Sequence, residues 1–213
     1  MLVNVKNVYK KFLGEYVLND VSLDIDYGDR IAMMGPNGAG KTTLIRAILG
    51  FYHIDKGEIR VSGFDPIKER VKVLQNISFI PQLPPPIKIS LEEMISFIVK
   101  SSGVSKELIF EESARMDLDL KSNLHKQFFK LSGGMKQKLL IAIALSKKSS
   151  LLVFDEPTAN LDPKGRDNFY HLLEDLDEKC STLFITHRLD EIEELVNRKI
   201  YMDLGKIVED EKI

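Results

Sequence analysis

The chain has 213 residues, of which 44% are hydrophobic and 29% are charged. This composition is typical of a globular protein of one or two folding units with a sizeable core. Lysine and arginine total 30 against 32 for aspartate and glutamate, so the formal net charge of -2 lacks the basic excess typical of nucleic-acid binders. We therefore expect no nucleic-acid partner.

Membrane spans and disulfides are also not indicated. The longest unbroken apolar run, Leu139 to Leu145, is far too short to cross a bilayer. The first residues lack the long apolar stretch of a signal peptide. Cys180 is the single cysteine, which rules out an internal disulfide and suits a reducing compartment. We expect a cytoplasmic location.

The first third of the chain predicts strands and one helix. Apolar residues recur in the pattern of strands, or form short buried runs, at 3–8, 17–25, 30–34, 58–61 and 77–80. The run at 30–34 ends directly at Gly35, which predicts a buried strand that feeds a loop. Residues Lys41 to Leu49 predict a helix that Gly50 ends.

The middle of the chain is helical. Pro84, Pro85 and Pro86 forbid a helix and predict a stiff, extended connection. Beyond them, Ser90 and Glu93 form a capping box at the start of one predicted helix. Two further helices are expected at about 105–116 and 133–147, the last of them deeply buried because 139–145 is apolar nearly all round.

Alternating strands and helices then return. We predict strands at 151–154 and 182–186, helices at 163–177 and 189–196, and a closing hairpin at 199–208 around Leu204-Gly205-Lys206. The chain therefore predicts a single α/β domain, with a core of residues 1–82 and 149–213 and a helical insert at 83–148.

One glycine-rich segment fits the P-loop pattern in full, GxxxxGK followed by Thr. Its expected ligands to a nucleoside triphosphate are Gly35, Pro36, Asn37, Gly38, Ala39, Gly40, Lys41, Thr42 and Thr43. The glycines let backbone N–H groups converge on phosphate oxygens, and the following helix adds its positive dipole end. Lys41 would reach the β- and γ-phosphates, and the Thr42 hydroxyl would bind Mg²⁺.

Two carboxylates follow the apolar run Leu151 to Phe154. They would emerge at the C-terminal end of a central strand, where ligands bind in open α/β sheets. We expect Asp155 to hold Mg²⁺ and Glu156 to orient or deprotonate the attacking water. Without a P-loop in the same chain, an acidic strand end before a turn would explain the pair equally well.

A second glycine-rich turn lies at Leu131-Ser132-Gly133-Gly134. Ser132 can cap the helix that begins there, and the glycines expose backbone N–H groups at its positive end. By itself this is an ordinary capped helix. Together with the P-loop and the Asp155-Glu156 strand end, it resembles, in motif order and over nearly the whole chain, the nucleotide-binding subunit of an ATP-binding cassette (ABC) transporter.

The resemblance implies a RecA-like P-loop core with an N-terminal antiparallel β part and an inserted α-helical subdomain. It gives roles to further residues. Gln82 matches the glutamine that senses Mg²⁺ and contacts nucleotide, and His187 matches the catalytic switch histidine near the γ-phosphate. The segment 159–162 matches the loop through which two subunits communicate. Phe12 is the expected adenine-stacking aromatic, with Tyr9 and Tyr16 as alternatives.

The resemblance also implies how such a subunit works. It is a Mg²⁺-dependent ATP hydrolase that forms a homodimer, each ATP lying between the P-loop of one copy and Ser132, Gly133 and Gly134 of the other. A separate integral membrane permease would be the second partner, holding this chain at the cytoplasmic face of the membrane, and the short architecture is similar to that of exporters. The family usually has Gln where this chain has Met135.

Three other classes fit parts of the pattern. A non-transport ABC ATPase of cofactor or metal-centre assembly has a similar length. A nucleotide-binding regulator without turnover would not need both Glu156 and His187. A simple P-loop kinase would not need Ser132-Gly133-Gly134. The residues do not identify the transported substrate or the membrane partner, because substrate contacts would lie in that partner.

Overall fold

The computed structural model describes all residues from 1 to 213, and they divide into two units. The first unit contains residues 1–78, 150–155 and 177–213. The second unit contains residues 79–149 and 156–176. The segment 156–176 thus groups with the helical part of the chain. That the chain is one domain, with a core of 1–82 and 149–213 and an insert at 83–148, stays a prediction.

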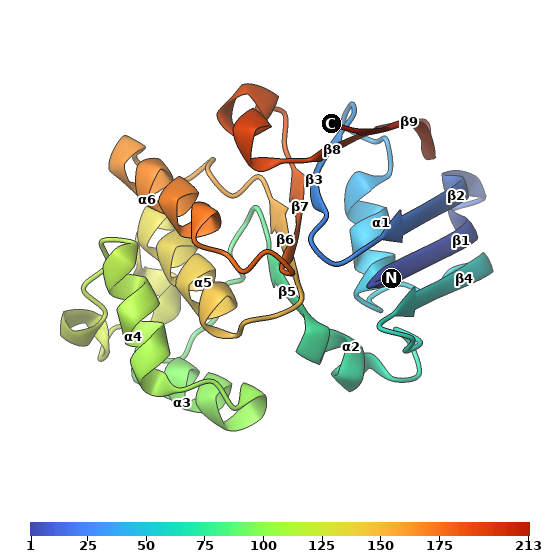
Figure 1. Ribbon diagram of the computed structural model, residues 1–213. Helices are drawn as coiled ribbons and strands as arrows, with labels where there is room; N and C mark the ends of the chain where they lie inside the picture. The colour runs from blue at the N-terminus through green and yellow to red at the C-terminus, as the bar shows by residue number, and fades with distance from the viewer. The chain divides into compact units, whose positions relative to one another are not determined.

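An antiparallel three-stranded sheet forms the N-terminal part of the first unit. Its strands are β1 (Val3–Phe12), β2 (Glu15–Ile25) and β4 (Lys56–Val61), in the order β2-β1-β4. Alternate residues of β1 such as Val3 and Val5 are buried, as expected for a sheet with one covered face. Helix α1 (Lys41–Ile48) lies beside this sheet (Figure 1).

A six-stranded sheet has the order β5-β6-β7-β3-β8-β9. Its strands are β3 (Arg30–Met34), β5 (Ile77–Ile80), β6 (Leu151–Asp155), β7 (Ser181–Ile185), β8 (Arg198–Asp203) and β9 (Lys206–Lys212). Strands β6, β7, β3 and β8 pair in parallel, and β9 returns antiparallel to β8. Every residue of β7 is buried, which explains why its sequence is a continuous run instead of an alternation.

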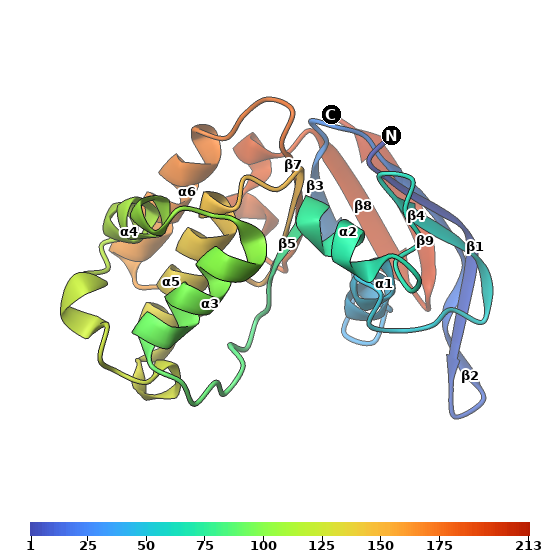
Figure 2. The same ribbon diagram turned by 90° about the horizontal axis from the view of Figure 1, so that it is seen from below.

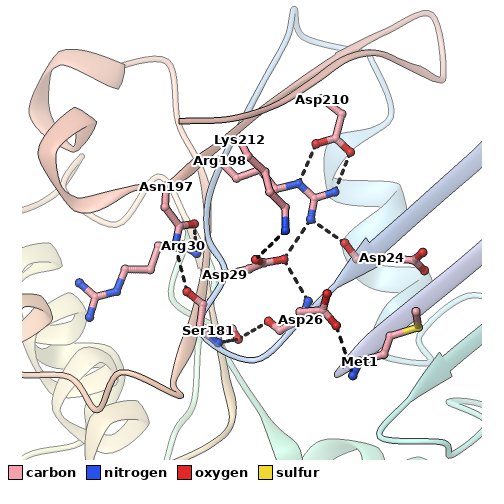
Figure 3. A network of polar contacts seen from close by, with 11 residues as sticks. Met1, Asp24, Asp26, Asp29, Arg30, Ser181, Asn197, Arg198, Asp210 and Lys212 are labelled. Atoms are coloured by element: carbon pink, nitrogen blue, oxygen red, sulfur yellow. Dashed lines mark hydrogen bonds and ion pairs between the residues drawn. The ribbon is translucent and has the colours of Figure 1, made fainter.

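A network of polar side chains lies between β2, the turn before β3, β8 and β9 (Figure 3). The buried guanidinium of Arg198 donates two hydrogen bonds to Asp210 of β9, at 2.7 and 2.6 Å, and one to Asp29, at 3.0 Å. A further bond reaches the carbonyl of Asp24 at the end of β2. Hydrogen bonding to Asp210 raises the pKa of Arg198 above its usual value. The network ties β2, β8 and β9 together.

The second unit is helical (Figure 2). Its helices are α3 (Leu91–Ser102), α4 (Lys106–Arg115), α5 (Gly133–Ser146) and α6 (Pro163–Glu174), with short 3-10 turns at Lys121–Asn123 and Phe128–Lys130. Phe128 and Leu139 are fully buried in its core, together with Leu91 and Ile109. No helix of the chain combines the length and the apolar character needed to cross a membrane.

Most of the predicted elements are present, and one is wrong. The capping box of Ser90 and Glu93 forms in both directions, as predicted. The helix predicted at 189–196 is instead two 3-10 turns, Leu189–Glu191 and Glu193–Leu195. Crowded carboxylates and the absence of a side-chain cap disfavour an α-helix there. Helix α2 (Arg70–Asn76) was not predicted, and it too has no capping side chain.

Candidate active site

The P-loop runs from the end of β3 into α1, in a conformation that needs its glycines. Gly35 has φ of 139°, and a Cβ placed there would lie 2.0 Å from the carbonyl oxygen of Met202. Gly40, which precedes α1, has φ of 100°, and its Cβ would lie 2.6 Å from the carbonyl oxygen of Val17. No other residue fits these two positions without moving the backbone of β2 or β8.

Lys41 begins α1 and lies inside the loop. Its side chain is buried, and its ammonium donates hydrogen bonds to the carbonyl oxygens of Gly35 at 2.6 Å and Pro36 at 3.0 Å. The first turn of α1 holds no acidic residue. A fixed cation at the N-terminus of a helix, with no competing carboxylate in that turn, is suited to a polyphosphate.

The strand register brings the ends of three strands to the same edge of the sheet. Met33 of β3 pairs with Ile185 of β7, and Ile185 pairs with Asp155 of β6. Gly35 and His187 each follow two residues later along their strands. The C-terminal ends of β3, β6 and β7 therefore present the P-loop, a carboxylate and an imidazole at one edge, where α/β sheets bind ligands.

The oxygen donors of the first unit fit Mg²⁺. Thr42 is half-buried in the first turn of α1, and Asp155 is half-buried at the end of β6. No group of three or more His, Cys, Asp or Glu side chains in the chain could hold a metal by itself. This pattern suits Mg²⁺, which typically binds one or two carboxylates and completes its shell with substrate phosphates and water.

Glu156 follows Asp155 but belongs to the second unit. Its side chain is half-buried, and its backbone has φ of 49°, in the left-handed region that favours glycine. His187 belongs to the first unit and is exposed, with the buried Thr186 immediately before it. The unit boundary thus falls between the two neighbouring carboxylates.

Ser132 caps α5, as the sequence predicts. Its hydroxyl accepts a hydrogen bond from the backbone N–H of Met135 at 3.2 Å. Ser132 and Gly133 are exposed at the start of this helix, and Gly134 is half-buried. The N-terminus of this helix is therefore capped and accessible.

The segment 159–162 lies against this helix start. A Cβ at Gly134 would be 3.0 Å from the carbonyl oxygen of Asn160, whose side chain donates a hydrogen bond to the carbonyl oxygen of Gln82 at 3.3 Å. The second unit thus brings together Gln82, the glycines of α5 and the 159–162 segment. The side chain of Gln82 is exposed.

Sequence reasoning missed one ion pair at this site, between a buried lysine and an exposed carboxylate. The ammonium of Lys138 in α5 lies 3.1 Å from a carboxylate oxygen of Asp162, and Lys138 is buried. The hydrogen bond from Lys138 holds the pKa of Asp162 below its usual value. The sequence around a lysine in an apolar helix does not indicate which carboxylate it pairs with, because that partner is distant along the chain.

The three candidate aromatics for a base differ in exposure. Phe12 and Tyr16 are 40% and 46% exposed. Tyr9 is half-buried, and desolvation together with a hydrogen bond to Asp20 raises its pKa. The structure thus leaves Phe12 and Tyr16 as the more accessible rings, and Phe12 ends β1 at the hairpin tip.

A P-loop between a buried strand and a helix, with a carboxylate at the end of a parallel strand in the same sheet, defines a P-loop nucleotide-binding α/β protein. The family model described as ABC transporter matches residues 18–159. The chain belongs to the ABC transporter family, as its ATP-binding, ATP-hydrolysing cassette.

Known proteins agree with this membership. The chain is 34% identical to an uncharacterized ABC transporter ATP-binding protein, YdbJ, of Bacillus subtilis, covering 97% of this chain and 68% of that protein. It is also 34% identical to the glutamine transport ATP-binding protein GlnQ of Escherichia coli, covering 98% and 90%. A solved ATP-binding subunit of an ABC transporter matches with a TM-score of 0.90 at 25% identity, covering 100% of this chain and 90% of that one.

Proposed function

We propose that this chain is the ATP-hydrolysing subunit of a transporter, working as a dimer of two copies on a separate membrane subunit. The observation that carries the proposal is that Gly35 and His187 follow, by two residues, positions of β3 and β7 that are in register with Asp155 of β6. A P-loop, a carboxylate and an imidazole at one sheet edge support the proposal that these groups bind phosphate, bind metal and sense the γ-phosphate, respectively.

The triphosphate is bound by the P-loop, whose proposed contacts are Gly35, Pro36, Asn37, Gly38, Ala39, Gly40, Lys41, Thr42 and Thr43. Backbone N–H groups and the start of α1 face the phosphate oxygens. Lys41 gives up its hydrogen bonds to two P-loop carbonyl oxygens and donates instead to the β- and γ-phosphates. Phe12 stacks on the adenine.

Mg²⁺ is the proposed cofactor, held by Thr42, Asp155 and Gln82. When bound, Mg²⁺ would supply positive charge that offsets the negative charge on the phosphates. Glu156 orients and deprotonates the attacking water, and His187 contacts the γ-phosphate from the end of β7.

Ser132, Gly133 and Gly134 are proposed to complete the site of the second copy. Their helix N-terminus is capped, exposed and suited to an anion, although the P-loop of the same chain already provides a phosphate site. ATP would join two copies, and hydrolysis would release them by removing the bridging charge. A solved bacterial ABC transporter cassette that is dimeric matches this chain with a TM-score of 0.83 at 25% identity.

The resemblance to the family is the basis for proposing a membrane subunit and a direction of transport. We propose that the chain is held at the cytoplasmic face of the membrane by a permease, and that the complex exports its substrate. Relatives at 30–34% identity include a glutamine transport protein, an iron import protein and a lipid A-core flippase, so they favour neither direction. Co-purification of a membrane protein with the tagged chain would separate transport from a non-transport role.

The dimer is tested by Glu156→Gln, which removes the base and keeps the shape of the side chain. With saturating ATP and Mg²⁺ we expect hydrolysis to fall by at least about a hundredfold and a nucleotide-bound dimer to accumulate, measured by sedimentation. Lys41→Ala in the same background should abolish the dimer, because it weakens nucleotide binding. A Glu156→Gln chain that binds ATP yet stays monomeric would contradict the proposed dimer.

A further inference from the structure

The exposed ring of Phe12 has a protein neighbour that the proposed function does not use. The ring centroid of Tyr52 lies 5.3 Å from that of Phe12, with the two planes at 73°, the edge-to-face arrangement that aromatic pairs favour. The ammonium of Lys10 lies 5.2 Å from the centroid of Phe12. Phe12 is thus held by two side chains while 40% of its surface stays open.

Tyr52 is in turn held from α1. Arg46, in the last turn of that helix, donates a hydrogen bond from Nη1 to the Tyr52 hydroxyl at 3.0 Å, and its guanidinium lies 5.8 Å from the ring centroid. Helix α1 begins with Lys41 of the P-loop. A chain of side-chain contacts therefore runs from the phosphate-binding helix through Arg46 and Tyr52 to Phe12.

The loop that carries Tyr52 is anchored at both ends. The backbone N–H of Phe51 donates to the carbonyl oxygen of Arg46 at 2.8 Å. At the other end, the N–H of Asp55 donates to the carbonyl oxygen of Tyr9 at 2.8 Å, and the Asp55 carboxylate accepts from the N–H of Lys11 at 2.5 Å. These bonds restrict the movement of Tyr52 relative to β1.

We propose that Tyr52, held by Arg46, is a positioning residue that keeps the Phe12 ring oriented for stacking on a purine base. An exposed aromatic ring without a neighbour must be ordered when the base binds, which weakens binding, whereas a ring already held loses less freedom. The inference rests on the proposed role of Phe12, and it links base recognition to the helix that binds the phosphates.

The test compares two ligands in equilibrium titrations. Tyr52→Ala should raise the dissociation constant of Mg·ATP about threefold to tenfold. The constant of Mg·tripolyphosphate, measured by competition against ATP, should not change, because that ligand has no base. Tyr52→Phe keeps the ring and loses only the bond to Arg46, so it should restore most of the ATP affinity.

Phe51→Ala is the matched control. Phe51 is an exposed aromatic of the same loop, but its ring contacts the guanidinium of Arg70, at 4.4 Å. We expect its removal to leave both constants unchanged. In the Phe12→Ala background, Tyr52→Ala should have no further effect on ATP binding, because the ring that it orients is absent.

Each contrary result has a distinct meaning. Equal losses of affinity for ATP and for tripolyphosphate in Tyr52→Ala would overturn the positioning role. So would a loss of ATP affinity in Tyr52→Ala that adds to the loss in Phe12→Ala. An effect of Phe12→Ala without any effect of Tyr52→Ala would also overturn it, and would leave the proposed function intact. A Phe12→Ala chain with unchanged ATP affinity would instead remove the proposed base contact, and the inference with it.

Discussion

Glu156 shows how a single residue can be strained where chemistry is expected. Its φ of 49° lies in the left-handed region, which costs a residue with a Cβ about 1 kcal/mol relative to glycine. A glycine would relieve this strain and remove the carboxylate proposed to act on water. We therefore expect Glu156 to lower the stability of the fold while it places a functional carboxylate.

Two substitutions separate the backbone strain from the loss of the side chain. Both Glu156→Gly and Glu156→Ala remove the carboxylate, so both should abolish ATP hydrolysis. Only glycine relieves the left-handed conformation, and we expect Glu156→Gly to be more stable than Glu156→Ala by about 1 kcal/mol. Urea unfolding measures the difference. Equal stability of the two variants would show that the conformation is not strained.

Asp55 provides a prediction about pH. The N–H of Lys11 donates to its carboxylate, and this bond, with the nearby charge of Lys10, lowers the pKa of Asp55 below its usual value. A carboxyl group with a lowered pKa stabilises the fold above its unfolded-state pKa, and the contribution is lost as the pH falls through the folded-state pKa. Carboxyl NMR titration should show Asp55 titrating below the ordinary aspartate range. Asp55→Asn should reduce the loss of stability between neutral and acidic pH.

At the scale of elements, the hairpin of β8 and β9 depends on one cation. Strand β9 is almost entirely exposed and offers few apolar contacts. Arg198 compensates because it bonds Asp210 of β9 and Asp29 of the turn before β3 while its side chain is only 9% exposed. Removing this cation would leave the Asp29 carboxylate, 11% exposed, without its main partner.

Arg198→Met tests the network. Because the nearly buried Asp29 carboxylate would keep only the N–H of Asp26 and the more distant ammonium of Lys212, we expect the free energy of unfolding to fall by roughly 3 kcal/mol. The matched control is Arg60→Met, which breaks an ion pair of a half-buried arginine with the exposed Glu58 and should change stability much less. Denaturant unfolding gives both values. A similar small effect for the two variants would show that the network contributes little.

At the scale of the whole molecule, the chain crosses between its two units several times. The first unit is assembled from three segments and the second from two. One crossing lies between Asp155 and Glu156, so the proposed metal ligand and the proposed base belong to different units. A ligand that binds only the dimer would stabilise the folded chain relative to the unfolded chain.

Thermal unfolding with nucleotide provides the test at this scale. With ATP and Mg²⁺, the unfolding midpoint of Glu156→Gln should rise as protein concentration increases, because dissociation of the dimer is coupled to unfolding. Without nucleotide the midpoint should not depend on concentration. A midpoint that rises with ATP but is independent of protein concentration would mean that nucleotide binds a single copy.

The sequence alone determined the features set by neighbouring residues. The P-loop, the caps at Ser90 and Ser132 and the strand before Asp155 follow from rules that act over a few residues, and all of these elements form. Only the tertiary structure decided which strand ends lie side by side, that Lys138 pairs with Asp162, and that Tyr52 packs on Phe12. Contacts of this kind join residues far apart in the chain, and local periodicity carries no information about them.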